Sequence, residues 1–306
     1  MILIKSRKDL PLSNGTMVYH MKPIDLHVHS NASDGTFTPT EVILTAKEAG
    51  LSAIALTDHD TVSGIAEAKK AANIHNIELI VGSEFSCHYQ NTEIHVLGFF
   101  LDETNEELLN NFQTFIDNRE QRNLCMIEKF NQHGIPITFD MLCAENPDAV
   151  ITRAHFARAL MELGVVKSKD QAFRKYLNPN CPFYVPRPKL DPKETIRIIK
   201  NAGGMAFLAH PMLYQLGYQQ VASMLDDLIE YGLEGVEVYH SSNHALESSH
   251  LKSMALSKNL LISGGSDFHG SNKPDISIGT GRGNMFVPYE WLENIKQKRA
   301  NIKILS

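Results

Sequence analysis

The sequence predicts an α/β barrel interrupted by one helical insertion. From residue 24 onward, short apolar segments alternate with helical patterns, while residues 102–190 carry helical patterns and no convincing strand. Strands that alternate with helices are typical of an α/β barrel or, failing that, of an open doubly wound sheet. The predicted strands are residues 24–29, 53–57, 78–82, 94–99, 205–209, 235–239 and 260–263.

The helical patterns divide the chain into four parts. We expect an N-terminal tail at residues 1–20, a first barrel part at 21–101, a helical insertion at 102–190 and a second barrel part at 191–306. A proline-rich stretch at 179–192 closes the insertion. The barrel helices are predicted at residues 40–49, 62–73, 193–201, 221–230 and 245–257, and the insertion helices at 106–132, 153–163 and 169–176.

Composition excludes several classes of protein. The chain has 306 residues, of which 43% are hydrophobic and 21% charged, so disorder and a disulfide scaffold are disfavoured. Its net charge of −6 disfavours an electrostatic grip on long double-stranded nucleic acid. No apolar run suggests a membrane span, and four cysteines without a C-x-x-C pair suit the reducing cytoplasm. The unusual feature is 14 histidines, which indicate either an unusual surface or a metal site.

Side chains that can bind metal stand at the ends of most predicted strands. His27 and His29 are two residues apart, and the strand period of two places both on one face. The carboxyl ends of barrel strands meet at one mouth, so we expect such residues to gather there. The other strand-end candidates are His59, Glu84, His210, Asp267 and His269. We further expect Asp58 and Asp60, which flank His59, to orient imidazole N–H groups.

Five segments, in this order, carry a family resemblance. They are H-V-H-S, A-L-T-D-H-D, G-S-E, A-H-P and G-S-D-F-H, and together they resemble the polymerase and histidinol phosphatase (PHP) superfamily of metal-dependent phosphoesterases. Within it, S-D-G, H-V-L-G and T-R-A-H resemble the bacterial TrpH/YciV-like branch. The resemblance implies a distorted (β/α)7 TIM-like barrel with a trinuclear metal centre. It also implies action on nucleotide phosphomonoesters and on the 5′ ends of short RNA.

The resemblance implies nine metal ligands. Nine nitrogen and oxygen ligands suit three ions if Glu84 or Asp267 bridges, and imidazole with carboxylate favours Mn²⁺, Fe²⁺ or Zn²⁺, with Mn²⁺ expected first. From the residues alone, His95 fits a buried core histidine equally well, and Asp34 before Gly35 is also ordinary turn chemistry. The implied ligands are His27, His29, Asp34, His59, Glu84, His95, His210, Asp267 and His269.

Four residues of the insertion are expected to bind substrate. Arg119 and Arg122 are three apart on a helix and therefore share one face, and Arg153 precedes His155 by two residues. Guanidinium groups bind phosphate bidentately, and in the branch resembled a helical cap carries such contacts. The alternative is a solvated, charged helix face. At the end of another strand, His240 is the expected general acid, or else a structural partner of a ligand.

The predicted function is phosphate ester hydrolysis by a metal-activated hydroxide, without a covalent intermediate. We expect conversion of a nucleoside 3′,5′-bisphosphate to the 5′-monophosphate and phosphate, with 5′–3′ trimming of short RNA. Histidinol-phosphate phosphatase of the same superfamily is an alternative, which the arginines of the insertion disfavour. An amidohydrolase is disfavoured because no predicted strand ends in lysine. A non-catalytic metal-binding module is disfavoured because all nine ligand types are present.

Overall fold

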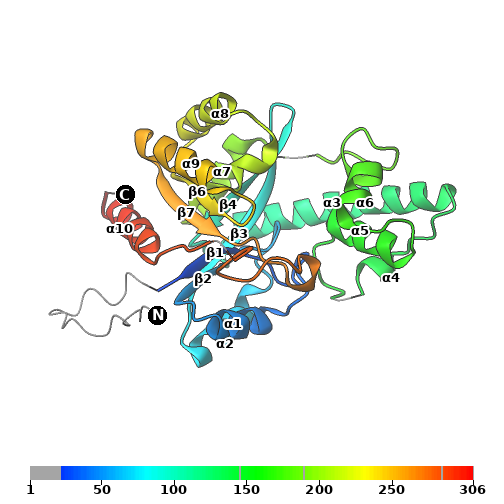
Figure 1. Ribbon diagram of the computed structural model, residues 1–306, viewed down its shortest axis with the longest axis horizontal. Helices are drawn as coiled ribbons and strands as arrows, with labels where there is room; N and C mark the ends of the chain where they lie inside the picture. Colours follow the sequence, from blue (N-terminus) through cyan, green and yellow to red (C-terminus); the bar gives the residue numbers. More distant parts are fainter. Residues whose placement is uncertain (1–21, 145, 189, 284, 306) are drawn as a thin grey trace, which may run out of the picture.

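One seven-stranded sheet, closed into a barrel, forms the centre of the molecule (Figure 1). The computed structural model describes residues 22–144, 146–188, 190–283 and 285–305, so the predicted tail at 1–20 lies outside the described residues. The backbone N–H of Asp267 donates to the carbonyl of His27 over 2.9 Å, and Val28 bridges to Phe268, which joins the first strand to the last. The barrel is therefore confirmed over the open sheet. The strands are β1 (Ile24–Val28), β2 (Ala53–Leu56), β3 (Glu78–Tyr89), β4 (Thr92–Phe99), β5 (Met205–Leu208), β6 (Gly235–His240) and β7 (Leu261–Gly265).

The barrel is distorted by a hairpin. Strands β1 to β3 and β5 to β7 run parallel to their neighbours, whereas β4 is antiparallel to both β3 and β5. The prediction ended the third strand at residue 82, but β3 continues to Tyr89. It continues because Phe85 and Cys87 are buried in the apolar core, while Glu84 and Ser86 pair with Leu97 and His95 of β4. No helix separates these two strands.

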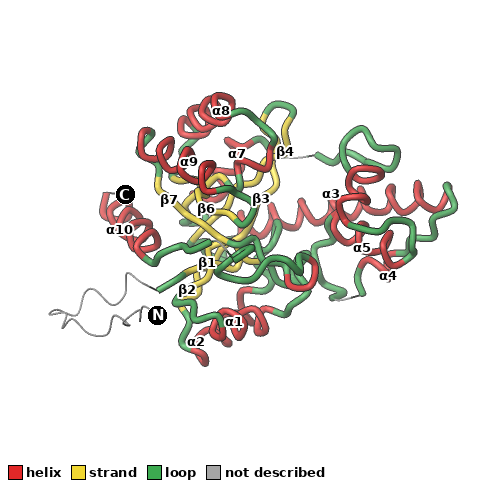
Figure 2. The backbone as a smooth tube through the Cα atoms, viewed as in Figure 1, coloured by secondary structure: helices red, strands yellow, loops and turns green. Residues whose placement is uncertain are grey.

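Helices cover the outside of the sheet, as Figure 2 shows. Val42, Ile196 and Leu225 belong to a core that packs these helices on the strands. A second cluster, which includes Leu26 and Phe207, contains alternate residues of the same strands. The covering helices are α1 (Pro39–Glu48), α2 (Ile65–His75), α7 (Pro192–Asn201), α8 (Tyr218–Glu230), α9 (Ala245–Ser257) and α10 (Glu290–Leu305), with short turns η3 (Pro211–Tyr214) and η4 (Gly270–Asn272).

The helices between β4 and β5 project to one side of the barrel (Figure 1). Phe112, in the first half of the long helix α3, packs into the barrel core, whereas Phe130 in its second half joins a separate apolar cluster. In that cluster the rings of Phe130 and Phe183 stack with centroids 4.2 Å apart. The elements of this region are α3 (Glu106–Gln132), α4 (Phe139–Leu142), α5 (Arg153–Glu162), α6 (Lys169–Ala172) and the π-helical turn η2 (Phe173–Leu177). Among the described helices, none combines the length and apolarity that crossing a membrane requires.

The closure of the barrel depends on the absence of a side chain at Gly265. A Cβ atom there would lie 2.3 Å from the Cβ of His27 and 2.4 Å from its backbone nitrogen. We expect Gly265→Ala to lower the free energy of unfolding by about 3 kcal/mol or more, because β1 must move. Urea denaturation measures the change. The control is Gly217→Ala, whose Cβ would lie 3.6 Å from Oε1 of Gln220 and which should cost about 1 kcal/mol or less. Equal effects of the two substitutions would contradict this account of closure.

Candidate metal centre

The carboxylate of Glu84 lies at the centre of a ring of imidazoles. Its position in β3, beyond the predicted end of that strand, brings it opposite Leu97 of β4. Burial raises the pKa of Glu84, but His59, His27 and His95 together hold that pKa well below its ordinary value. The group is therefore an ionised acceptor. Its two oxygens lie 2.8–3.2 Å from a ring nitrogen of each of His27, His29, His59, His95 and His210.

Two imidazoles, one in strand β1 and one directly after it, have their Nε2 atoms close together. The Nε2 atoms of His27 and His29 are 3.1 Å apart, as the strand period predicted for residues on one face. The orientation of the His27 ring is set by Glu237 of β6, which lies 3.0 Å from Nδ1. The other oxygen of Glu237 accepts the backbone N–H of His210 over 2.7 Å. Glu237 thereby turns Nε2 of His27 toward the centre, as carboxylates behind metal-binding histidines do.

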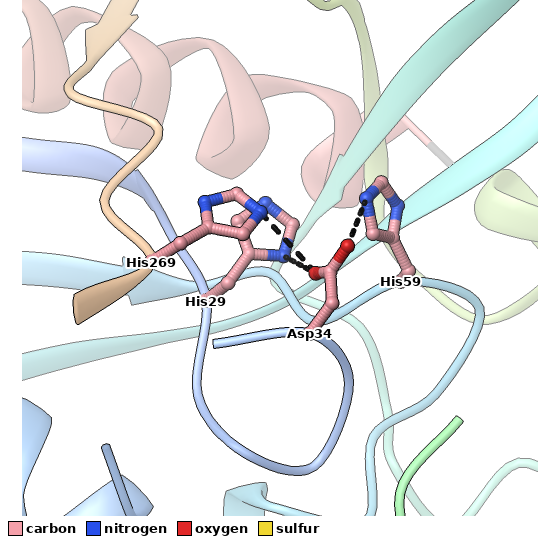
Figure 3. Close-up of side chains that lie close together, drawn as sticks. All are labelled: His29, Asp34, His59 and His269. Atoms are coloured by element: carbon pink, nitrogen blue, oxygen red, sulfur yellow. Dashed lines mark ion pairs between the residues drawn. The ribbon is translucent and has the colours of Figure 1, made fainter. Parts of the chain in front are cut away.

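Asp34, in a loop after β1, lies among three imidazoles, two of which also contact Glu84 (Figure 3). It lies 3.2 Å from His269 and 3.8 Å from both His29 and His59. Its Oδ2 also accepts the hydroxyl of Thr152 over 3.0 Å, so the helical region contacts the centre directly. This contact orients one oxygen of Asp34 and leaves the other, Oδ1, without a hydrogen bond.

The two carboxylates beside His59 have partners that were not predicted. Asp58 accepts the hydroxyls of Ser30 and Ser33 over 2.7 and 2.6 Å, and thus anchors the loop that carries Asp34. Asp60 pairs with Arg119 instead. Asp58 reaches an imidazole only through Ser33, whose hydroxyl lies 3.5 Å from Nδ1 of His29, and the ion pairs of Asp60 are with Arg119 and Arg187, so neither carboxylate contacts a ring directly in these bonds.

All nine side chains implied by the family resemblance lie in four overlapping groups. Within each group, one donor atom per residue lies within 4.8 Å of the others, and His27, His29, His59 and Glu84 each belong to more than one group. The groups are His29, Asp34, His59 and His269; His27, Glu84 and His210; His27, His29 and Asp267; and His59, Glu84 and His95. The cluster is therefore one continuous centre.

The donor atoms suit divalent transition metals. His210 Nδ1 is buried without a hydrogen-bond partner, and Asp34 Oδ1 and His59 Nδ1, also buried, have contacts with His269 and Glu84 at 3.2 Å that lack hydrogen-bond geometry. Such atoms are costly to bury unless another ligand compensates them. Burial lowers the pKa of His210 to about 4, so its ring is neutral near pH 7, the form that binds metal.

His240 lies at the edge of this centre. Its Nε2 is 3.4 Å from Oδ2 of Asp267, and its Nδ1 accepts the backbone N–H of Ser242 over 3.1 Å. Because Nδ1 accepts, the proton of a neutral ring resides on Nε2. Lys273, which the sequence analysis did not single out, also pairs with Asp267. The role of His240 as a general acid stays a prediction.

A pocket rich in arginine adjoins the centre. Asp34, His59 and His95 line it beside Arg119, Arg122 and Arg153, so the structure brings the predicted arginines to the predicted ligands. Arg119 and Arg122 are each only 5% exposed, which excludes the alternative of a solvated helix face. Sequence reasoning missed three further lining residues, Phe173, Tyr184 and Arg187.

Arg122 is the least compensated of these cations. Its Nη2 is buried without a hydrogen-bond partner, while Arg153 has Glu93 at 2.8 Å. Burial and the neighbouring guanidinium groups of Arg119 and Arg187 lower the pKa of Arg122 well below its ordinary value. A buried charge under this pressure is stabilised by a bound anion. The pocket is therefore suited to an anionic group.

The structure places His155 one step behind the pocket. Its Nδ1 accepts the backbone N–H of Thr152 over 3.0 Å at the start of α5, and it is not among the lining residues. Because Thr152 donates to Asp34, His155 supports that carboxylate indirectly.

Comparisons with known proteins agree on one family. The PHP domain family matches residues 25–178. A 5′–3′ exoribonuclease of Haemophilus influenzae is 36% identical, with 81% of this chain and 90% of the relative covered. A 3′,5′-nucleoside bisphosphate phosphatase of Chromobacterium violaceum is also 36% identical, with 85% and 91% covered. A solved amidohydrolase structure from Chromobacterium violaceum, with bound sulfate and no metal, superposes with a TM-score of 0.79 at 34% identity, with 84% and 90% covered.

Replacing Glu84 tests whether this centre binds metal. We expect Glu84→Gln to reduce bound metal per chain and to slow phosphate release at least about 100-fold, because the amide loses the charge and one acceptor. Elemental analysis of protein purified with Mn²⁺ measures the first effect. Glu78→Gln, at the opposite end of the same strand, serves as the control and should retain full metal content. Unchanged metal content in Glu84→Gln would refute a metal-binding role for this residue.

The cap formed by His155 predicts a pH dependence of stability. Burial lowers the pKa of His155 to about 4, so the folded state favours the neutral ring. In the unfolded chain the pKa of this histidine is about 6.5. The contribution of His155 to the free energy of unfolding is therefore complete above pH 6.5, and it decreases by up to about 3 kcal/mol as the pH falls from there toward 4. Glutamine also accepts at this cap position, so His155→Gln should remove this part of the dependence. Urea denaturation of both proteins at pH 7.5 and 5 measures the difference, and parallel losses would contradict the assignment.

Proposed function

The chain belongs to the PHP domain family, an enzyme family that hydrolyses phosphoester bonds, and on this premise we propose that it converts nucleoside 3′,5′-bisphosphates to 5′-monophosphates and phosphate. The same site would remove nucleotides from the 5′ end of short RNA. The observation that supports this substrate is the arginine pocket, which shares Asp34, His59 and His95 with the candidate metal centre. A bisphosphate has one phosphate for each of the two sites.

The charge of the pocket suits a phosphate monoester. Four guanidinium groups, those of Arg119, Arg122, Arg153 and Arg187, line it with the carboxylate of Glu93, and Asp60 pairs with two of them. If Asp34, which also lines the pocket, is assigned to the candidate metal centre, the four guanidinium groups exceed Glu93 and Asp60 by two positive charges. A phosphate monoester carries about −1.5 to −2 at neutral pH, so it would neutralise this surplus.

The same pocket offers surfaces for a nucleoside. Phe173 and Tyr184 line it, and aromatic rings of this kind stack with nucleobases without strong sequence preference. The activities named for the two relatives also share one bond. In both of the reactions that we propose for this chain, water would cleave the ester at the 3′ oxygen of a nucleotide that carries a 5′ phosphate. One arrangement of anchor and hydrolytic centre would therefore serve both substrates.

We propose that the nine clustered residues would hold three divalent ions, with Mn²⁺ first and Fe²⁺ or Zn²⁺ as alternatives, and that Glu84 or Asp267 would contribute to more than one ligand set. Bound ions of this kind lower the pKa of a water molecule and neutralise phosphoryl charge. Within the chain, Glu237 orients His27, and the arginines hold the second phosphate. His240 would donate a hydrogen bond from Nε2 to the leaving oxygen, which takes up its proton from water. No side chain forms a covalent phosphoenzyme.

Histidinol phosphate is a poorer candidate for the same site. It carries an ammonium group in place of the second phosphate, and the positive surplus of the pocket would repel that group. We place the enzyme in the cytoplasm, where nucleotides occur and where the four free cysteines would stay reduced.

The test of the proposal is a substrate comparison with the Mn²⁺-loaded enzyme. We expect kcat/KM for adenosine 3′,5′-bisphosphate to exceed that for adenosine 3′-monophosphate by about 100-fold or more, since two charge-assisted hydrogen bonds suffice for that difference. Histidinol phosphate should be hydrolysed more slowly still. Equal or higher kcat/KM for either of the other two substrates would refute the proposed substrate.

Arg122 should carry a large share of this preference. We expect Arg122→Met to lower kcat/KM for the bisphosphate about 10- to 100-fold, because the variant lacks a buried phosphate donor. Hydrolysis of adenosine 3′-monophosphate should change little. Arg174→Met, an exposed position in the same helical region, is the matched control. A uniform loss on both substrates would assign Arg122 to folding of the region instead.

A further inference from the structure

We propose that Asp60 is a positioning residue that sets the preference for a second phosphate by holding Arg119 and Arg187 together. This inference rests on the proposed function, because it concerns the anchor for the phosphate that is not hydrolysed. Asp60 itself is not among the residues that line the pocket, so it acts through the two arginines.

Two guanidinium groups converge on one oxygen of Asp60. Nε of Arg119 lies 3.1 Å from Oδ2, Nη2 of Arg119 contacts the same oxygen, and Nη2 of Arg187 lies 3.5 Å from it. The side chains are 1% exposed for Asp60, 7% for Arg119 and 5% for Arg187. Ion pairs so shielded from water are stronger and less mobile than surface pairs. This carboxylate therefore restrains both cations.

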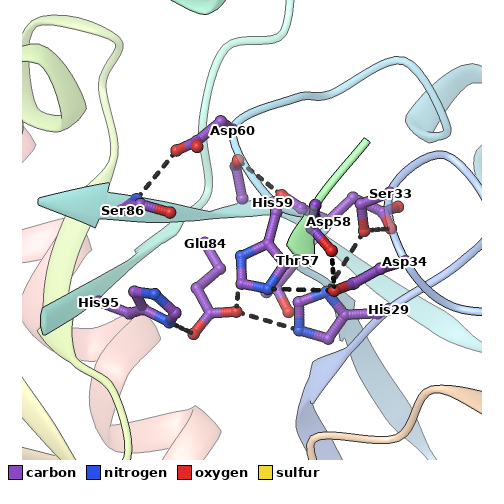
Figure 4. Close-up of polar contacts among 12 residues, drawn as sticks. His29, Ser33, Asp34, Thr57, Asp58, His59, Asp60, Glu84, Ser86 and His95 are labelled. Carbon is purple, nitrogen blue, oxygen red and sulfur yellow. Dashed lines mark hydrogen bonds and ion pairs between the residues drawn. The ribbon is translucent and has the colours of Figure 1, made fainter. Parts of the chain in front are cut away.

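Strand β3 fixes the carboxylate in turn. Oδ1 of Asp60 accepts the backbone N–H of Ser86 over 2.9 Å (Figure 4). The hydroxyl of Ser86 in turn accepts a hydrogen bond from Nη2 of Arg119 over 3.0 Å. Both oxygens of Asp60 are thus engaged, one by the backbone and one by the arginines. Two side-chain oxygens, Oδ2 of Asp60 and Oγ of Ser86, thus orient the guanidinium group of Arg119.

The backbone at Asp60 separates two functions that are adjacent in sequence. Asp60 has a φ of 53°, in the left-handed region that Asp tolerates better than most residues. Its backbone N–H donates to the carbonyl of Glu84 over 3.0 Å. Figure 4 shows the consequence, since the ring of His59 points toward Glu84 while the carboxylate of Asp60 points away toward Ser86. One turn thereby places His59 in the candidate metal centre and Asp60 beside the arginines of the pocket.

A purely neutralising role for Asp60 predicts the opposite sign. If the carboxylate only reduced the positive charge of the pocket, its removal would strengthen phosphate binding and lower KM. If it holds the arginines in place, its removal lets two like charges separate, and KM for a second phosphate rises. The sign of the change in KM distinguishes the two roles.

The experiment uses Asp60→Asn, which keeps the shape of the side chain and removes its charge. In the Mn²⁺-loaded enzyme we expect KM for adenosine 3′,5′-bisphosphate to rise about tenfold or more, with kcat changed less than about threefold. For adenosine 3′-monophosphate, KM and kcat should both stay within about twofold of the wild type. Metal content should be unchanged. An unchanged or lowered KM for the bisphosphate would overturn the inference.

Two further proteins complete the test. Asp275→Asn, an exposed carboxylate paired with Arg282, controls for the substitution and should leave all parameters at wild-type values. If Asp60→Asn does not fold or loses metal, Ser86→Ala removes one fixed partner of Arg119. It should raise KM for the bisphosphate alone by about threefold, and no change would overturn the inference. Failure of the proposed function is separate, since the wild type would then show no preference for the bisphosphate.

Discussion

The contact of one carboxylate with five imidazoles is the constraint on which the rest of the fold depends. Glu84 reaches His27, His59 and His210 from strands and strand ends that are distant in sequence. A regular barrel would end β3 before this residue and insert a helix. The chain instead continues the strand into a hairpin with β4, which brings His95 back to the same carboxylate at 2.8 Å. The antiparallel hairpin of β3 and β4, which breaks the symmetry of the barrel, is therefore also the element that brings His95 to Glu84.

The sequence was informative where local periodicity determines position. Alternation in β1 places His27 and His29 on one face, and the meeting of strand ends at one mouth brings Asp267 to them. It was uninformative for contacts made between segments. The length of β3 was missed because Gly82 resembled a strand end, whereas pairing with β4 continues the strand. Arg187 lies between two prolines, in a stretch without periodicity, so only the tertiary fold reveals that it faces Asp60.

The helical region does more than cover the barrel. Thr152 orients Asp34, and the backbone N–H of Val150 donates to the carbonyl of Ala32 in the same loop over 3.0 Å. The region that supplies the arginines of the pocket thus also holds one carboxylate of the candidate centre. Its own apolar cluster, built around Phe130, keeps these contacts in register. The arginine pocket and the candidate metal centre are therefore connected by direct contacts between the helical region and the loop that carries Asp34.

The spacing between anchor and centre is set by the backbone of the barrel. Because His59 and Asp60 are consecutive, and Glu84 and Ser86 lie on the same strand, the arginine pair is tied to the atoms that also define the centre. A rigid spacing discriminates by the distance between two phosphates. In both proposed substrates, a free 3′,5′-bisphosphate and the 5′ end of RNA, one ribose separates the two phosphates, so the proposed arrangement would suit both.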